Sequence, residues 1–269
     1  MNHSHTLELD SLTIGYTVGK KQTSVVFPSL SGILEGGTLT CLLGSNGVGK
    51  STLLRTLASF QPPLGGKMLI DGVSIAELSA RRLATQIAVV LTVKPTADRL
   101  TVRQVVALGR SPYTGFWGNC TEVDWQVVDE AMRLTGIAPL AERNSGTLSD
   151  GERQKMMIAK ALAQQTPIIL LDEPTAFLDY PAKVETLLLL RRIAHEQGKI
   201  IFLSTHDVEL ALQLSDRLWL MERESPMQCG SPRQLAADGS LSRFYRHDFL
   251  HFDASTLRFE IPSSDTSVS

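Results

Sequence analysis

One segment constrains the fold more than any other, because it matches the pattern G-x-x-x-x-G-K-[ST]. Its residues in order are Gly44, Ser45, Asn46, Gly47, Val48, Gly49, Lys50, Ser51 and Thr52. An apolar, strand-like run precedes the segment at 39–43, and a helix-like run follows it at 52–58. A strand, this loop and a helix in succession are the context in which the pattern binds phosphate. The sequence therefore predicts a phosphate-binding loop in an α/β fold, rather than a glycine-rich turn that binds nothing.

The spacing of this segment follows from the chemistry of phosphate binding. Gly44, Gly47 and Gly49 allow backbone N–H groups to approach phosphate oxygens without a clash from Cβ. The helix that follows directs its positive N-terminal end at the same anion. We expect Lys50 to reach the β- and γ-phosphates and the Ser51 hydroxyl to hold Mg²⁺.

Composition limits the other possibilities. The chain has 269 residues and a formal net charge of −2, which suits one large domain or a domain with a subdomain. The sequence has no basic run or stripe that would indicate nucleic-acid binding. No apolar stretch approaches the roughly 18 residues needed to cross a bilayer. Residues 1–6 lack the apolar core of a secretory signal, and three scattered cysteines do not make a disulfide framework. These features favour a reduced, cytosolic compartment.

Further runs of apolar residues outline the remaining elements. Strand-like runs lie at 6–14, 25–34, 68–70, 87–91, 168–171 and 199–203, and helical periodicity prevails from about residue 92 to 165. Asp71-Gly72 is a hairpin-type turn signal. Thr101 and Asp179 are typical residues to cap helices, and Gly198 is typical of a helix end. Wholly apolar strands alternating with helices predict a largely parallel sheet covered by helices.

Two predicted strands end in residues suited to phosphate chemistry. The first ends in Asp172 and Glu173, so Asp172 is placed to orient Mg²⁺ and Glu173 to polarise an attacking water. Alone, two carboxylates could simply begin a turn, but with a phosphate loop they supply the second half of one Mg²⁺ site. The other strand is followed by His206, which could contact the γ-phosphate.

The motifs, in this order, resemble those of the ATP-binding subunit of ABC transporters over about residues 6–225. The decisive segment is 148–152, LSDGE, which is similar to the family's LSGGQ motif and lies 20 residues before the Asp-Glu pair. Tyr16 matches the adenine-stacking aromatic, Asp179 the D-loop and His206 the switch histidine. The resemblance implies a P-loop NTPase with a RecA-like core, an N-terminal antiparallel β part and a helical subdomain inserted at about 92–165. It assigns residues 1–225 to the ATPase domain and 226–269 to a C-terminal extension.

The resemblance also implies how the protein would work. Two copies would meet head to tail and close on two ATP molecules. Each ATP would lie between one copy's phosphate loop and the Ser149 hydroxyl and Gly151 N–H of the other copy. Glu173 would act as general base, with His206 on the γ-phosphate. Integral membrane permease subunits would be the partners, a substrate-binding protein would act indirectly, and the chain would sit peripherally on the cytoplasmic face of the inner membrane.

The sequence departs from the family pattern at two places. Asp150 and Glu152 replace the usual Gly and Gln of the LSGGQ motif. Asp150 suits a helix N-terminus but adds negative charge near a triphosphate, so we expect weakened or retuned dimer closure rather than its loss. Thr92 stands where the family has a Gln after the strand at 87–91. Its shorter side chain has a single hydroxyl, which puts Mg²⁺ ligation and coupling to the membrane partner at this position in question.

The cargo is indicated only by the segment 100–113, with Gly109-Arg110-x-Pro112, which resembles the branch serving iron–siderophore, haem and vitamin B12 importers. The alternatives are an ATPase of another ABC transporter, exporters included, and a soluble ATP switch outside transport. Two aromatic groups have open roles. Those in the loop 111–121 form a local cluster or a docking surface. Phe244, Tyr245, Phe249, Phe252 and Phe259 pack on the core or form a dimer contact.

Overall fold

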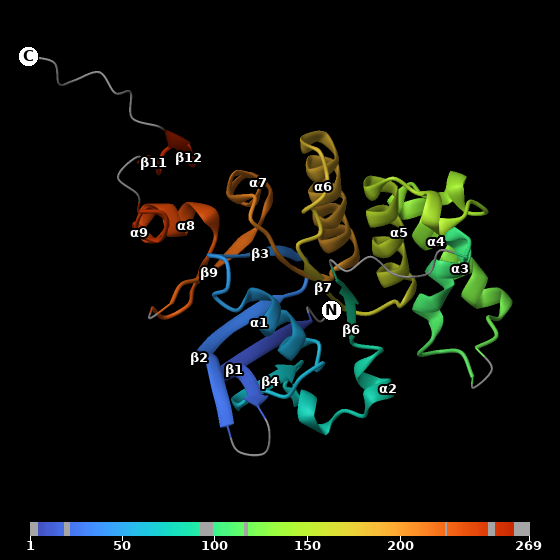
Figure 1. The fold of residues 1–269 in the computed structure, drawn as a ribbon, viewed down its shortest axis with the longest axis horizontal. Coiled ribbons are helices and arrows are strands. Elements are labelled where there is room, and N and C mark those ends of the chain that lie inside the picture. The colour runs from blue at the N-terminus through green and yellow to red at the C-terminus, as the bar shows by residue number, and fades with distance from the viewer. Residues whose placement is uncertain are drawn as a thin grey trace, which may run out of the picture.

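The computed structural model describes residues 5–18, 22–91, 99–115, 118–223, 225–246 and 251–260. Thr92 of the expected Gln position, Phe116, Trp117 and Phe249 lie outside these residues. Two sheets form the centre, with helices above the larger one and at its two sides (Figure 1). Within the described residues, no helix is both long and apolar enough to cross a membrane.

The larger sheet has six strands. It contains four of the apolar runs seen in the sequence, at 39–43, 87–91, 168–171 and 199–203. Its order is β10 (Gln228–Gly230), β9 (Arg217–Met221), β3 (Thr38–Gly44), β8 (Ile200–Ser204), β7 (Ile168–Asp172) and β6 (Ile87–Val90). All neighbours are parallel except β10, which runs antiparallel to β9. The predicted, largely parallel α/β sheet is therefore confirmed. Because β3, β7 and β8 all run the same way, their carboxyl ends meet at one edge, which holds the site.

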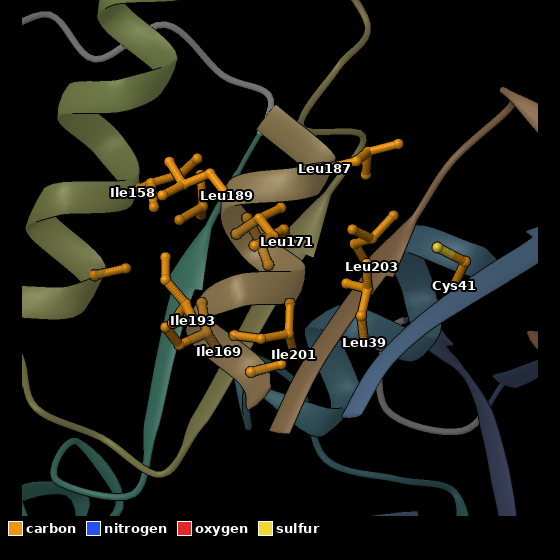
Figure 2. Packing of buried hydrophobic residues seen from close by; sticks show 14 of the residues in the cluster. Leu39, Cys41, Ile158, Ile169, Leu171, Leu187, Leu189, Ile193, Ile201 and Leu203 are labelled. Atoms are coloured by element: carbon orange, nitrogen blue, oxygen red, sulfur yellow. The ribbon is translucent and has the colours of Figure 1, made fainter. Parts of the chain in front are cut away.

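Alternation along these strands divides the core into two layers. Ile169 and Leu171 belong to the cluster that includes the helices on one face, whereas Ile168 and Leu170 belong to the cluster on the other face. Side chains of successive strand residues point to opposite faces, so a strand buried on both faces must be apolar throughout. Figure 2 shows the first layer, where Ile169, Leu171 and Ile201 lie against a helix that carries Leu189 and Ile193.

The second sheet is antiparallel and packs under the first with α1 (Lys50–Leu57). Its order is β2 (Gln22–Glu35), β1 (Thr6–Val18), β4 (Gly65–Ile70) and β5 (Val73–Ser74). Leu7 and Leu9 of β1 are buried in the cluster that also holds Leu53 of α1. The predicted hairpin turn joins β4 to β5, with φ of 51° at Asp71 and 78° at Gly72. Positive φ at both central residues matches the strand twist.

The helices begin and end where the sequence predicts caps. The Asp179 side chain accepts from the Ala182 N–H at the start of α6 (Tyr180–Gln197), which ends at left-handed Gly198. Thr101 forms a capping box at α3 (Val102–Ala107). The other helices are α2 (Ala80–Leu83), α4 (Glu122–Thr135), α5 (Asp150–Ala163), α7 (Val208–Leu214), α8 (Pro232–Ala237) and α9 (Ser240–Phe244). Helices α3, α4 and α5 form one group at the side of the β6 edge (Figure 1).

Arg110, which follows α3, connects α4 and α5 through hydrogen bonds. Its guanidinium donates to Asp124 Oδ1 at 2.9 Å and to the Ala163 carbonyl at 2.8 Å, and only 5% of Arg110 is exposed. Gly109 has no room for a side chain, because a Cβ there would lie 2.2 Å from the Lys160 carbonyl oxygen. Tyr113 stacks on Arg110 and donates its hydroxyl to Gln164 O at 2.9 Å. The segment that resembles a transporter branch thus has a packing role in this fold.

The described part of the C-terminal region packs on the protein rather than standing apart. After β10 come α8, α9 and a hairpin of β11 (His251–Asp253) and β12 (Arg258–Glu260). Phe244, Tyr245, Phe252 and Phe259 contact one another edge-on or tilted, with centroids 4.7–5.1 Å apart, and pack against the helix-side core. Of the two roles considered for these four rings, the structure shows core packing. The division of the chain at residue 225 stays a prediction.

Candidate nucleotide-binding site

The phosphate loop runs from the end of β3 at Gly44 to the start of α1 at Lys50. Gly47 and Gly49 have φ of 74° and 119°, in the region that favours glycine. A Cβ on Gly49 would lie 2.6 Å from Val26 Cγ1, and one on Gly44 would lie 2.7 Å from the Met221 carbonyl oxygen. A side chain at either position would therefore clash with its neighbours, so the loop needs glycine there.

Lys50 lies inside the loop. Its ammonium donates to the Gly44 carbonyl at 2.7 Å and to the Ser45 carbonyl at 3.2 Å, and 6% of the residue is exposed. Burial lowers the pKa of Lys50, while the carboxylates of Glu173 and Asp172 act in the opposite direction. A buried ammonium held by two neutral carbonyls is well placed to exchange them for charged phosphate oxygens, which are stronger acceptors.

The loop and the end of β7 supply oxygen ligands at one point. Ser51 Oγ donates to Asp172 Oδ1 at 3.3 Å, although the two residues are 121 positions apart. Magnesium prefers oxygen ligands and takes only one or two from a protein, the rest coming from phosphates and water. A hydroxyl beside a carboxylate at the phosphate loop fits that preference, so Ser51 and Asp172 lie together as the sequence predicts for a Mg²⁺ site.

Glu173 lies beside the predicted switch histidine. His206 Nε2 and Glu173 Oε1 are 2.6 Å apart, and the histidine is the more exposed of the two side chains. Glu173 has φ of 47°, a left-handed conformation that costs a non-glycine residue free energy and that is enriched at functional sites. The Glu173 N–H donates to the Ser204 hydroxyl at 2.9 Å.

Two further side chains border the loop. Tyr16 on β1 shares a 2.6 Å hydrogen bond with the Thr52 hydroxyl and is 42% exposed, which leaves much of it open to solvent next to α1. Arg223, which follows β9, donates from Nη2 to the Gly47 carbonyl at 3.2 Å. Asp179 caps α6 and is exposed.

The LSDGE segment forms the start of α5. Ser149 is the N-cap, and its N–H and Oγ both donate to the Glu152 carboxylate at 2.8 and 2.9 Å. These bonds lower the pKa of Glu152, and Arg143 lies 3.4 Å from the same carboxylate. A Cβ on Gly151 would meet no atom within 4 Å. None of the hydrogen bonds of Ser149 reaches the phosphate loop of the same chain. Hydrogen bonding therefore does not join the LSDGE segment to the phosphate loop within one copy.

Comparison with known proteins places this chain in a family. The family model described as "ABC transporter" matches residues 27–176. The achromobactin transport ATP-binding protein of Dickeya dadantii is 35% identical over 237 residues, covering 88% of this chain and 86% of the relative. The iron(3+)-hydroxamate import ATP-binding protein of Bacillus subtilis is 32% identical over 244 residues, covering 91% of this chain and 89% of the relative.

A solved structure extends the similarity to three dimensions. It is a dimeric post-hydrolysis state of an ATP-binding cassette bound to ADP and Pi, with a TM-score of 0.70 and 25% identity, covering 82% of this chain and 97% of that one. The chain therefore belongs to the ABC transporter family. It is an ATP-binding ATPase subunit of that family, with the P-loop NTPase fold that the motif order implies.

Sequence patterns alone do not single out three residues of the site. Arg143 and Arg223 are surface arginines in sequence, and only the fold brings them to Glu152 and to the loop. Ser204 is the last residue of an apolar strand. A signal for Ser204 does exist, because a hydroxyl that ends a wholly apolar, buried strand needs a hydrogen-bond partner.

Proposed function

We propose that this chain is the ATP-hydrolysing subunit of an importer for an iron chelate, acting on the cytoplasmic face of the inner membrane. The observation that carries this proposal is the meeting of Lys50, Ser51, Asp172, Glu173 and His206 at the carboxyl ends of β3, β7 and β8. The cargo is proposed from the relatives, because two of them are described as an achromobactin transport and an iron(3+)-hydroxamate import ATP-binding protein.

Each residue of the site has a role in this proposal. The loop amides of 44–52 and the Lys50 ammonium bind the phosphates of ATP, and Tyr16 stacks on the adenine. Ser51 and Asp172 would hold Mg²⁺, which supplies charge neutralisation of the phosphates. Glu173 orients a water and takes its proton as the water oxygen bonds to the γ-phosphorus and the bond to the bridging oxygen breaks, leaving ADP and phosphate. His206, hydrogen-bonded to Glu173, contacts the γ-phosphate.

A second copy completes the site. Ser149 hydrogen-bonds to Glu152 and not to the phosphate loop of its own chain, and the space beside Gly151 is open. A head-to-tail dimer would place the N-terminus of α5, with Ser149 and Gly151, at the γ-phosphate bound to the other copy, where the helix end favours an anion. The solved cassette that is dimeric with ADP and Pi supports the pairing of two copies.

Glu152 provides a test of the dimer. Its carboxylate accepts the hydroxyl hydrogen of Ser149, the group that the partner's γ-phosphate would need. In Glu152→Gln the amide oxygen can still accept from Ser149 N–H, but the negative charge near the triphosphate is gone. We expect ATP-driven dimer formation in a hydrolysis-deficient background to strengthen about threefold, as expected for a fraction of a kcal/mol at a helix N-terminus. Analytical ultracentrifugation measures this.

A second Glu→Gln variant controls for the loss of one negative charge anywhere on the protein. Glu130 forms an exposed ion pair with Arg133 on α4, away from the start of α5, so Glu130→Gln removes the same charge elsewhere. It should leave ATP-driven dimer formation unchanged. Equal effects of the two substitutions, or no effect of either, would argue against a γ-phosphate at the start of α5.

The membrane partner is tested by purification. We propose that integral membrane permease subunits bind this chain and that a substrate-binding protein delivers cargo to them. The tagged chain, extracted from membranes in mild detergent, should bring a polytopic membrane protein identified by mass spectrometry. Recovery of soluble partners alone, or of none across several detergents, would favour an ATP switch outside transport.

The cargo is tested with the assembled complex in lipid vesicles. We expect ATP inside the vesicles to drive uptake of a ferric hydroxamate or another iron chelate supplied with its binding protein. Haem and cobalamin are the comparison compounds, and a complex carrying Glu173→Gln is the control for ATP dependence. Uptake of haem or cobalamin only would move the assignment to those cargoes. Outward movement of cargo would contradict an importer.

A further inference from the structure

Ser204 is the last residue of β8, with 0% of its surface exposed. It is the direct neighbour of Asp172 across the β7–β8 pair. Its hydroxyl donates to Asp172 Oδ1 at 2.7 Å and accepts from the Glu173 N–H at 2.9 Å. One buried hydroxyl therefore holds both Asp172, the last residue of β7, and Glu173, the residue that follows the strand. The two residues are proposed to serve different functions.

The geometry of Glu173 explains why this hydroxyl matters. With φ of 47°, Glu173 turns away from the strand, and its N–H points at Ser204 instead of continuing the sheet. A left-handed conformation at a non-glycine residue persists only where its surroundings hold it. The Ser204 oxygen supplies the acceptor that the turned N–H needs, since a buried N–H without one costs about 1–3 kcal/mol. The turn directs the Glu173 side chain to His206.

The Asp172 side of the same hydroxyl has a separate consequence. Asp172 Oδ1 receives Ser204 Oγ at 2.7 Å and Ser51 Oγ at the longer distance of 3.3 Å. The shorter bond comes from a buried residue, whereas Ser51 is exposed. Groups that hydrogen-bond a metal ligand orient it, and their loss commonly lowers metal affinity or activity about 10- to 100-fold.

From these contacts we propose that Ser204 is a positioning residue for ATP hydrolysis. Its single hydroxyl fixes the Asp172 carboxylate toward the phosphate loop and the Glu173 backbone in the turn that directs its carboxylate to the γ-phosphate. Ser204 is fully buried, and it acts through these two neighbours. The inference rests on the proposed roles of Asp172 and Glu173.

The first experiment distinguishes the effect of losing the Ser204 hydroxyl from the effect of changing the side-chain volume. Ser204→Thr and Ser204→Val add nearly the same bulk, but only Thr keeps the hydroxyl. We expect ATP turnover of Ser204→Thr to exceed that of Ser204→Val by about tenfold, at the lower end of the effects seen for groups that orient metal ligands. Equal turnover of the two variants would overturn the proposal. Ser204→Ala, which adds no bulk and needs no repacking, should resemble Ser204→Val; wild-type turnover of Ser204→Ala would equally overturn it.

The second experiment asks through which residue Ser204 acts. In a Glu173→Gln background, Ser204→Ala should lower the residual turnover by much less than it does in the wild type, because the base is already lost. Groups that act as a unit are non-additive in this way. A full, multiplicative loss would mean that Ser204 does not act through Glu173 and would contradict the proposal.

The third experiment uses a readout other than turnover. Binding of a fluorescent ATP analogue is measured with Mg²⁺ and with EDTA for wild type and Ser204→Ala. We expect Ser204→Ala to weaken binding several-fold with Mg²⁺, through the misdirected Asp172, and to leave binding in EDTA unchanged. Equal weakening in both conditions would show a general packing defect. Failure of the proposed function is distinguishable, because wild-type turnover in Glu173→Gln itself would remove the base assignment whatever Ser204 does.

Discussion

Glu173→Gln is expected to bind ATP with near wild-type affinity and to lose about a hundredfold or more of its turnover, the usual contribution of a general base. Glutamine keeps the size of the side chain and a hydrogen bond to His206 but cannot accept a proton from water. Lys50 and the loop amides, which hold the phosphates, are untouched. Turnover falls without a matching change in binding when the lost interaction operates only in the transition state.

The measurement is steady-state ATP hydrolysis beside equilibrium binding of a fluorescent ATP analogue. Glu196→Gln is the matched control, because Glu196 is an exposed carboxylate near the end of α6. It should retain full turnover. If Glu173→Gln hydrolyses ATP at the wild-type rate, Glu173 is not the base, and a water positioned by other groups must be sought.

The sequence predicts those parts of the site that a local pattern encodes. Gly47 and Gly49 have positive φ, so their spacing carries the loop geometry in the sequence itself. Wholly apolar runs such as 168–171 predict strands buried on both faces, and the alternation of Ile168 and Ile169 between two core layers follows from strand geometry. The order of these elements is what allowed Ser51 and Asp172 to be assigned to one site.

The remaining features depend on contacts between distant residues. Tyr16 and Thr52 meet across 36 positions, and Arg110 reaches Ala163 across 53. No spacing rule links such pairs, because their approach is decided by how the sheets and helices pack. Ser204 differs, since its position beside Asp172 follows once β7 and β8 are paired in register. The sequence therefore contained the strands but not the hydrogen bond between them.

Arg110→Ala is expected to destabilise the fold by about 3–5 kcal/mol, the cost of breaking a buried ion pair by removing one partner. Arg110 and Asp124 are 5% and 6% exposed, and Asp124 would keep only its bonds to Thr121. The substitution also removes the donor to Ala163 and the stacking partner of Tyr113. Urea unfolding followed by intrinsic fluorescence gives the change in free energy of unfolding.

A second arginine–aspartate pair joins the same region and provides the control. Arg103 and Asp129 link α3 to α4, but their side chains are 34% and 53% exposed, so Arg103→Ala should cost about 1 kcal/mol or less. Similar losses for the two variants would show that burial does not set the energy of the Arg110 pair.

The pH dependence of the free energy of unfolding tests the Arg110–Asp124 ion pair independently. Hydrogen bonds from Thr121, and then Arg110, hold the pKa of Asp124 below its usual range. A carboxyl whose pKa is lowered by folding stabilises the protein above its unfolded pKa, and this stabilisation is lost as pH falls through the folded pKa. Wild type and Arg110→Ala should therefore differ most near neutral pH and by less in acid, where only the lost donor to Ala163 and the lost stacking on Tyr113 remain. A difference that stays constant into acid would assign the loss to packing against Tyr113 and Ala163 instead of to charge.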